Sequence, residues 1–220
     1  MEIDKSEVKR YLRISGGNDD GLDSLIDELS QKALTLLCPK SILNRFSVTH
    51  EDGGIRINGT DIVFGGNLVK SVFDGCDEIF IFAATLTLQS ESLLKQCFAK
   101  STVDGIVCDS VLTAMIESYC DEIDDSICKQ VAKEGKTATR RISCGYGDFP
   151  LSCQKDILDI LNAPKFLGIK LNENNMMLPN KTVTAVMGVK KRDFDTASCM
   201  ESNSKNKCDC CDARCGFKRQ

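Results

Sequence analysis

The sequence feature that most restricts the fold is a series of apolar residues at every fourth position between residues 103 and 131. Side chains at this spacing lie on one face of an α-helix, and such a face is buried against another layer of the protein. The series stops before Gly135, and glycine commonly ends helices. The sequence therefore predicts one long amphipathic helix with Val103, Val107, Val111, Met115, Tyr119, Ile123, Ile127 and Val131 on its apolar face.

Three other stretches predict strands. Residues 46–64 alternate in polarity around two turn signals, Asp52-Gly53-Gly54 and Asn58-Gly59, and we expect a small antiparallel meander there. Residues 78–86, EIFIFAATL, are apolar at successive positions, which is typical of a central strand that is covered on both faces. The segment TVTAVMGV at 182–189 alternates and predicts a final strand.

Helices are expected between these strands. Asp4 or Ser6 can cap a helix that continues to Leu12, and a second helix precedes Pro39. Further helices are expected around residues 93–98 and from Pro150 to residue 161. Because helices and strands do not alternate regularly, the expected fold class is α+β, with an antiparallel sheet flanked by helices.

The length of the chain favours a single domain. We expect an α+β domain at residues 1–190, with a helical amino-terminal part at 1–40. Beyond residue 190 the apolar pattern fades into the polar segment ESNSKNK. Residues 191–220 are therefore expected to form a separate cysteine-rich tail, either flexible or metal-binding.

Composition argues against several classes of partner. The chain has no apolar run of the ~18–20 residues that a membrane helix needs, and its polar start, MEIDKSEVKRYL, lacks the apolar run of a secretion signal. We therefore expect a cytoplasmic protein without a membrane partner. No basic face with interleaved aromatic residues occurs, and there is no tryptophan, so nucleic acid is not an expected partner.

The thirteen cysteines fall into two groups. Eight lie among apolar or helical residues, and in a cytoplasmic protein we expect them to be reduced thiols. Those in the helical stretches are expected to behave as small core residues, namely Cys97, Cys108, Cys120 and Cys128.

The other five cysteines crowd the last 22 residues. Cys208, Cys211 and Cys215 have the spacing C-x2-C-x3-C, and Cys199 or Cys210 can supply a fourth thiolate. Four thiolates suit zinc or an iron–sulfur cluster, and a cluster could also pass an electron to another cofactor. The alternative is a flexible thiol-rich tail without metal.

The segment RRISCGYGDFPLSC, residues 140–153, has the composition of a small-molecule site. A guanidinium such as that of Arg141 can bind a carboxylate through two parallel hydrogen bonds. Gly145 and Gly147 allow a sharp turn and a close approach to a ligand, and Tyr146 between them offers a flat ring and a hydroxyl group. The alternative is a connector whose glycines only turn the chain.

Familiar catalytic signatures are absent from the sequence. The chain contains no G-x-x-x-x-G-K-[ST] motif, and Gly145-Tyr146-Gly147 lacks the third glycine of a dinucleotide fingerprint. His50, the single histidine, lies in a predicted hairpin, which argues against a nucleophilic site built on histidine.

Two motifs together carry a resemblance to a known family. They are R-x-x-x-G-Y at Arg141–Tyr146 and L-x-x-x-x-M-M-x-P-x-K-[ST]-V, which begins at Leu171 and leads into the final strand. In this order and at this distance they resemble the reactivation domain of cobalamin-dependent methionine synthase, in the form found as a separate chain. The similarity extends over roughly residues 78–190 and does not include the cysteine tail.

The resemblance implies a site for S-adenosylmethionine beside an antiparallel sheet. By position, Arg141 would bind the methionyl carboxylate, Ser143 and Cys144 would give backbone contacts, and Tyr146 would line the ligand. Gly145, within the same motif, is also a candidate binding residue. An acidic residue of the long helix would bind the ligand's ammonium group, and Glu117 is the candidate. No catalytic acid, base or nucleophile is implied.

The resemblance also implies an accessory function in methyl transfer. The domain would support reductive methylation of cobalamin on a separate corrinoid-binding methionine synthase or related methyltransferase, with an electron from a flavodoxin-like donor. Two alternatives remain open at this point: a noncatalytic scaffold with a degraded pocket, and an independent small-molecule methyltransferase. The glycine loop typical of the latter class after a first strand is not present.

Overall fold

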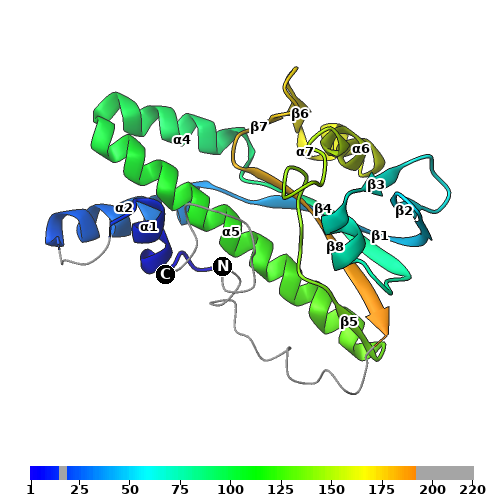
Figure 1. Cartoon of the computed structure of the whole chain (residues 1–220). Coiled ribbons are helices and arrows are strands. Elements are labelled where there is room, and N and C mark those ends of the chain that lie inside the picture. Colours follow the sequence, from blue (N-terminus) through cyan, green and yellow to red (C-terminus); the bar gives the residue numbers. More distant parts are fainter. Residues whose placement is uncertain (15–18, 192–220) are drawn as a thin grey trace.

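The computed structural model describes residues 1–14 and 19–191, and over these residues the main element is a six-stranded antiparallel sheet (Figure 1). Its strands are β1 (Lys40–Glu51), β2 (Gly54–Ile57), β3 (Val63–Gly65), β4 (Glu78–Thr85), β5 (Lys136–Ala138) and β8 (Thr182–Lys191). They lie in the order β3-β2-β1-β4-β8-β5, and helices flank the sheet. The predicted α+β class with an antiparallel sheet is therefore confirmed.

The meander predicted for residues 46–64 is formed by β1, β2 and β3. β1 begins earlier than the sequence pattern indicated, because residues 40–47 pair with β4 and only residues 48–51 pair with β2. Lys40 lies opposite Thr85 of β4, and Glu51 at the other end lies opposite Gly54 of β2. β1 thereby joins the meander to the central strands.

β4 lies between β1 and β8, as predicted for a central strand. Its side chains alternate between two apolar cores: Phe80 and Phe82 enter the first, whereas Ile79 and Ile81 enter the second. Since successive side chains of a strand point to opposite faces, covering both faces requires apolar residues at successive positions. This explains the EIFIFAATL pattern.

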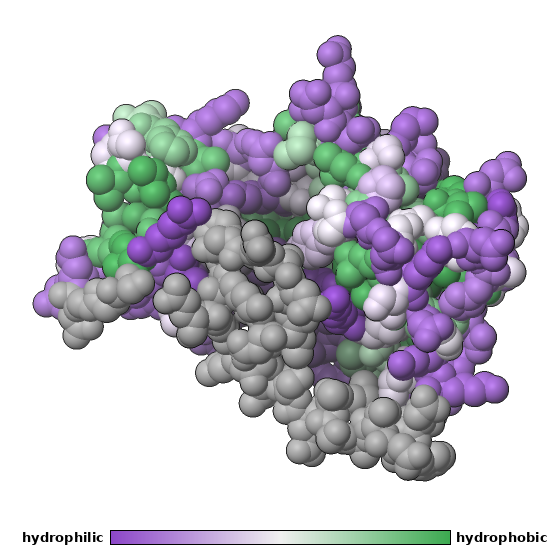
Figure 2. Space-filling view, in the orientation of Figure 1, coloured by the Kyte–Doolittle hydropathy of each residue, from purple (hydrophilic) through white to green (hydrophobic). Residues whose placement is uncertain are grey.

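Four helices enclose the first core, on the first side of the sheet. They are α1 (Lys5–Tyr11), α2 (Asp20–Leu36), α4 (Thr87–Lys100) and α5 (Thr102–Lys133). The α5 helix is the long helix predicted from the sequence, and it ends just before Gly135, which adopts a φ of +70°. Val103 was expected on its buried face but is exposed, and Figure 2 shows apolar surface at this α4–α5 end of the molecule.

The second face carries shorter elements around the second core. They are α3 (Asn67–Val72), α6 (Cys153–Ile160), α7 (Ala163–Leu167) and a hairpin of β6 (Lys170–Leu171) and β7 (Met177–Leu178). Phe73 and Phe149 are fully buried here. The sequence patterns did not predict α3 or the hairpin, and the helix expected from Pro150 begins instead at Cys153.

The eight cysteines within the described residues are free thiols, as expected. Cys97, Cys108 and Cys120 are buried in the first core, and Cys128 packs against it. The tail cysteines lie outside the described residues, so the zinc or iron–sulfur site stays a prediction. Within residues 1–14 and 19–191, no helix is both long and apolar enough to span a membrane.

Candidate functional site

A cavity of about 260 Å³ lies between the amino-terminal segment and the middle of α5. Most of its lining side chains are carboxylates, so its electrostatic potential favours positively charged ligands. Ala114, Ser118 and the Tyr11 ring complete the walls. The acidic residues are Glu2, Asp4, Glu7, Glu117, Asp121, Glu122 and Asp125.

Arg141 binds the acidic face of α5 beside this cavity. Its Nη2 donates to Glu117 at 2.5 Å, and its Nη1 donates to Asp121 at 2.9 Å and to Asp124 at 2.8 Å. The three carboxylates are four and three residues apart and therefore share one face of the helix. The side chains of Arg141 and Asp124 are only 15% and 9% exposed, whereas Glu117, at 39%, remains open to solvent.

Strand geometry explains how Arg141 reaches α5. The chain after β5 follows the edge of β8, where Ile142 and Val186 exchange two backbone hydrogen bonds of 3.0 and 2.8 Å. Ile142 is buried in the second core, on one side of the sheet. Because neighbouring side chains in extended backbone point in opposite directions, Arg141 points to the helical side.

The electrostatics of the cluster keep Arg141 charged. Burial by itself would lower the pKa of its guanidinium, but Asp124 and Glu117 outweigh that effect and raise the pKa above its ordinary value. Burial together with the negative charge of Glu117 raises the pKa of Tyr11 to about 12. Tyr11 is therefore a neutral hydroxyl in the cavity wall at neutral pH.

After Ile142 the chain makes the compact turn predicted from the glycines. Gly145 and Gly147 have φ values of +89° and +53°, which side chains rarely allow. The Gly145 N–H donates to Phe149 O at 2.8 Å, and the Tyr146 N–H donates to Ser143 O at 3.1 Å. The turn places Tyr146 at the surface, where the residue is 58% exposed.

Cys144 points away from this surface. It is buried in the second core, and burial raises the pKa of its thiol to about 12. The thiol is therefore protonated at neutral pH and is a poor nucleophile. The contact of the Cys144 backbone with a ligand therefore stays a prediction.

The structure brings two of the predicted binding residues into direct contact, Arg141 and Glu117. Glu117 also lines the cavity, whereas Tyr146 lies on the turn and is not one of the lining residues. Sequence reasoning missed Asp121 and Asp124. Their signal was available, because carboxylates at 117, 121 and 124 have the spacing of one helical face.

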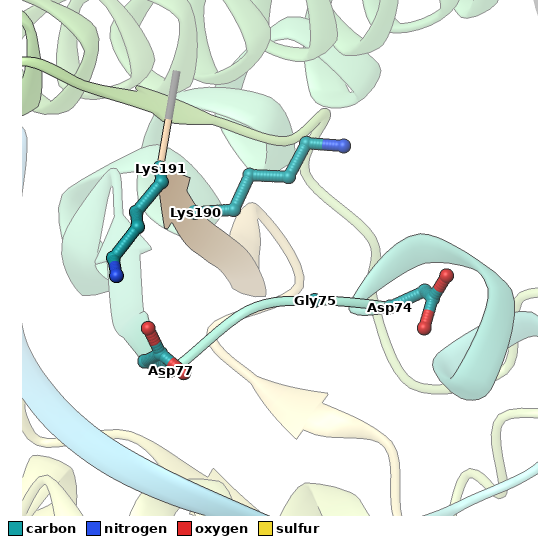
Figure 3. A pocket seen from close by; sticks show the side chains of 5 residues that line it. All are labelled: Asp74, Gly75, Asp77, Lys190 and Lys191. Atoms are coloured by element: carbon teal, nitrogen blue, oxygen red, sulfur yellow. The ribbon is translucent and has the colours of Figure 1, made fainter. Parts of the chain in front are cut away.

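A second cavity, of about 330 Å³, lies at the far end of β8. Figure 3 shows Lys190 and Lys191 on one side and the Asp74–Asp77 segment on the other. Two lysines and two aspartates offset each other's charge, and none of the predicted binding residues lines this cavity. The acidic cavity beside Arg141 is therefore the better candidate site.

No family model matches the sequence, and no curated protein matches it. Among solved structures, the crystal structure of the MetH reactivation domain bound to AdoHcy is similar, with a TM-score of 0.61. The match covers 86% of this chain and 76% of that chain. The two chains share a fold. At 14% sequence identity the likeness extends to the fold alone, so the ligand AdoHcy belongs to that structure.

Proposed function

We propose that this protein binds S-adenosylmethionine and supports reductive methylation of cobalamin on a separate corrinoid enzyme, methionine synthase or a related methyltransferase. The observation that carries the proposal is the pairing of Arg141, from the R-x-x-x-G-Y motif, with Glu117 at the edge of an acidic cavity. The fold shared with a reactivation domain whose structure contains AdoHcy supports it.

The charges of the ligand fit those of the cluster. S-adenosylmethionine carries a carboxylate, an ammonium group and a positively charged sulfonium. In the proposed complex the carboxylate binds Arg141 and the ammonium group binds Glu117, so the ligand exchanges one ion pair of the protein for two of its own. The remaining carboxylates of the cavity stabilise the sulfonium charge.

Asp121 and Asp124 have a different part in this complex. Both accept from Nη1 of Arg141, whereas Glu117 accepts from Nη2. When the ligand carboxylate replaces Glu117 on Arg141, the other two carboxylates therefore still hold and orient the guanidinium. We infer that they preorganise Arg141, which lowers the entropic cost of binding the ligand.

The turn completes the proposed site. The backbone of Ser143, Cys144 and Gly145 supplies polar contacts, and the exposed ring of Tyr146 provides a flat surface for the ligand. These contacts hold the sulfonium methyl group in a fixed direction. The protein contributes proximity and orientation, and no general acid, base or nucleophile is needed.

The partners follow from the reaction. One electron from a flavodoxin-like donor reduces cobalt(II) to cobalt(I), and the sulfonium methyl group passes to cobalt(I), which leaves S-adenosylhomocysteine. The methyl transfer consumes the reduced cobalt and so drives the unfavourable reduction. We place the corrinoid on a partner enzyme, because no corrinoid motif was found in this sequence, and we place the protein in the cytoplasm.

Calorimetric titration with S-adenosylmethionine tests the proposal. We expect Arg141→Ala to weaken binding by about 2–3 kcal/mol, or roughly 30- to 150-fold, because a charge-assisted pair is lost. Arg140→Ala is the matched control: it removes a neighbouring, exposed arginine, and it should bind the ligand like the unmodified protein.

Two outcomes would contradict the assignment. Unchanged affinity in a folded Arg141→Ala variant would show that Arg141 does not bind the ligand. No heat with the unmodified protein would favour a scaffold that keeps the fold without the pocket. If the ligand binds, methyl transfer from radiolabelled S-adenosylmethionine to a corrinoid enzyme, with reduced flavodoxin present, separates the proposed role from that of an independent methyltransferase.

A further inference from the structure

The carboxylate of Asp148 links the turn to a separate helix. Its Oδ2 accepts from the Asn67 N–H at 2.6 Å, and its Oδ1 accepts from the Leu68 N–H at 2.9 Å. These are the first two backbone N–H groups of α3, which helical geometry leaves without internal partners. The residue that normally caps such a helix is here Gly66, which has no side chain to do so.

The packing around these bonds is close. Gly66 has a φ of +116°, and a Cβ atom there would lie 2.7 Å from the backbone oxygen of Asp148. On the turn, a Cβ atom at Gly147 would lie 3.4 Å from a methyl group of Leu68. Glycine is therefore needed at residue 66 for the turn and α3 to approach each other this closely.

The helix is itself firmly held in the second core. Val69, within α3, and Phe73, immediately after it, are fully buried there. On the other side of Asp148, Phe149 is buried and contacts the ring of Phe64 edge-to-face, with 5.3 Å between ring centroids. The exposed Tyr146 is thus two residues from Asp148, which joins the turn to a helix packed in the second core.

We propose that Asp148 is a positioning residue, which holds the Gly145–Gly147 turn against α3 and thereby fixes Tyr146 for ligand binding. This inference rests on the proposed function of the turn. The N–H groups of Leu68 and Asn67 lower the pKa of Asp148, so the carboxylate is ionised, and each of its oxygens accepts one bond. An amide at the same position offers one acceptor oxygen in place of two.

The control is Asp19, whose carboxylate caps another helix through a single oxygen, Oδ1. It accepts from the N–H groups of Gly21 at 3.0 Å and Leu22 at 3.1 Å, at the start of α2. Asp19→Ala removes both of these bonds at the start of α2, whereas Asp148→Asn removes one of the two bonds that join the turn to α3. Far-UV circular dichroism shows that both variants are folded before they are compared.

Two measurements on each variant test the proposal. We expect Asp148→Asn to weaken S-adenosylmethionine binding about tenfold in calorimetry, because a small displacement of a binding group has a large effect. In ¹⁹F NMR of protein labelled with fluorotyrosine, the Tyr146 resonance should shift or broaden. Tyr11 and Tyr119 are the internal references, and Tyr→Phe variants assign the three signals. Asp19→Ala, which loses both bonds of its helix cap, should change neither measurement.

The two measurements test different parts of the proposal. If Asp148→Asn alters neither the Tyr146 resonance nor the affinity, Asp148 does not position the turn. If the resonance changes while the affinity stays within twofold, the contact is structural and the role in binding is wrong. If the unmodified protein does not bind the ligand, the proposed function fails, while the NMR result still decides whether Asp148 fixes Tyr146.

Discussion

Arg141 forms ion pairs with three carboxylates, whereas an ordinary ion pair has one. Of its three partners, Asp124 is the most buried, with 9% of its side chain exposed, whereas Glu117 is 39% exposed. A charge as buried as Asp124 requires compensation, because burial costs it the solvation that water would provide. Arg141 therefore has a structural role in addition to its proposed role in binding.

The first prediction concerns this structural role. We expect Arg141→Met to lower the free energy of unfolding by about 3 kcal/mol at pH 7, because it leaves the buried carboxylate of Asp124 without its cation. Urea unfolding measures the loss. The control is Arg56→Met, which breaks an exposed pair with Glu51 and should cost about 1 kcal/mol or less. Equal losses in the two variants would contradict the structural role.

At the scale of elements, ion pairs join the short edge strand β5 to its neighbours in addition to the backbone hydrogen bonds. β5 has three residues, which pair with the end of β8. Lys136 of this strand contacts Glu78 of β4, and Arg45 of β1 binds both Glu78, at 2.7 Å, and Glu134, at 2.6 Å. This network joins β1, β4, β5 and the end of α5.

The second prediction is a pH dependence of this network. The hydrogen bond from Lys136 lowers the pKa of Glu78 below its ordinary value of 4.5. The resulting stabilisation is present above about pH 4.5 and is lost as the pH falls through the lowered pKa. We therefore expect Lys136→Met to cost about 0.5–1 kcal/mol at pH 7, since the pair is partly exposed, and to cost much less near pH 3.

Denaturant unfolding at the two pH values measures this difference. Lys155→Met is the control, because Lys155 and Asp159 form an exposed pair at 3.6 Å that should contribute little at either pH. A loss for Lys136→Met that is the same at pH 3 and pH 7 would mean that packing, and not the charge of Glu78, accounts for it.

At the scale of the whole molecule, the sheet separates the two parts of the proposed site. The acidic cavity and α5 lie on the first face, whereas the turn packs against α3 on the second face. Arg141 connects the two, because its backbone follows the β8 edge and its side chain reaches α5.

The last prediction concerns the cysteine tail. We expect full-length protein, purified without oxygen, to contain about one zinc ion or one iron–sulfur cluster per chain. A variant that ends at residue 191 should lack the metal and keep its stability, because the six-stranded sheet and both cores lie within residues 1–191. Metal-free full-length protein with five reactive tail thiols would contradict the prediction.

Local patterns predicted much of the fold. The apolar residues at every fourth position of α5 and at successive positions of β4 are patterns among neighbouring residues, so they can be recognised in the sequence. The sequence alone therefore indicated the α+β class and the antiparallel sheet. Patterns failed where the local signal was short. α3 has six residues and is capped by Asp148, which is distant in the sequence. β5 has three residues and forms by pairing with β8.

The candidate site likewise has features that the sequence determined and features that only the tertiary structure decided. The sequence by itself determined the chemistry of the R-x-x-x-G-Y turn, because a guanidinium, two glycines and a phenol are properties of residue type. Only the tertiary structure decided that Arg141 meets Asp121 and Asp124 and that Asp148 caps α3. These contacts depend on how the turn follows the β8 edge, and residues distant in the sequence meet there through packing.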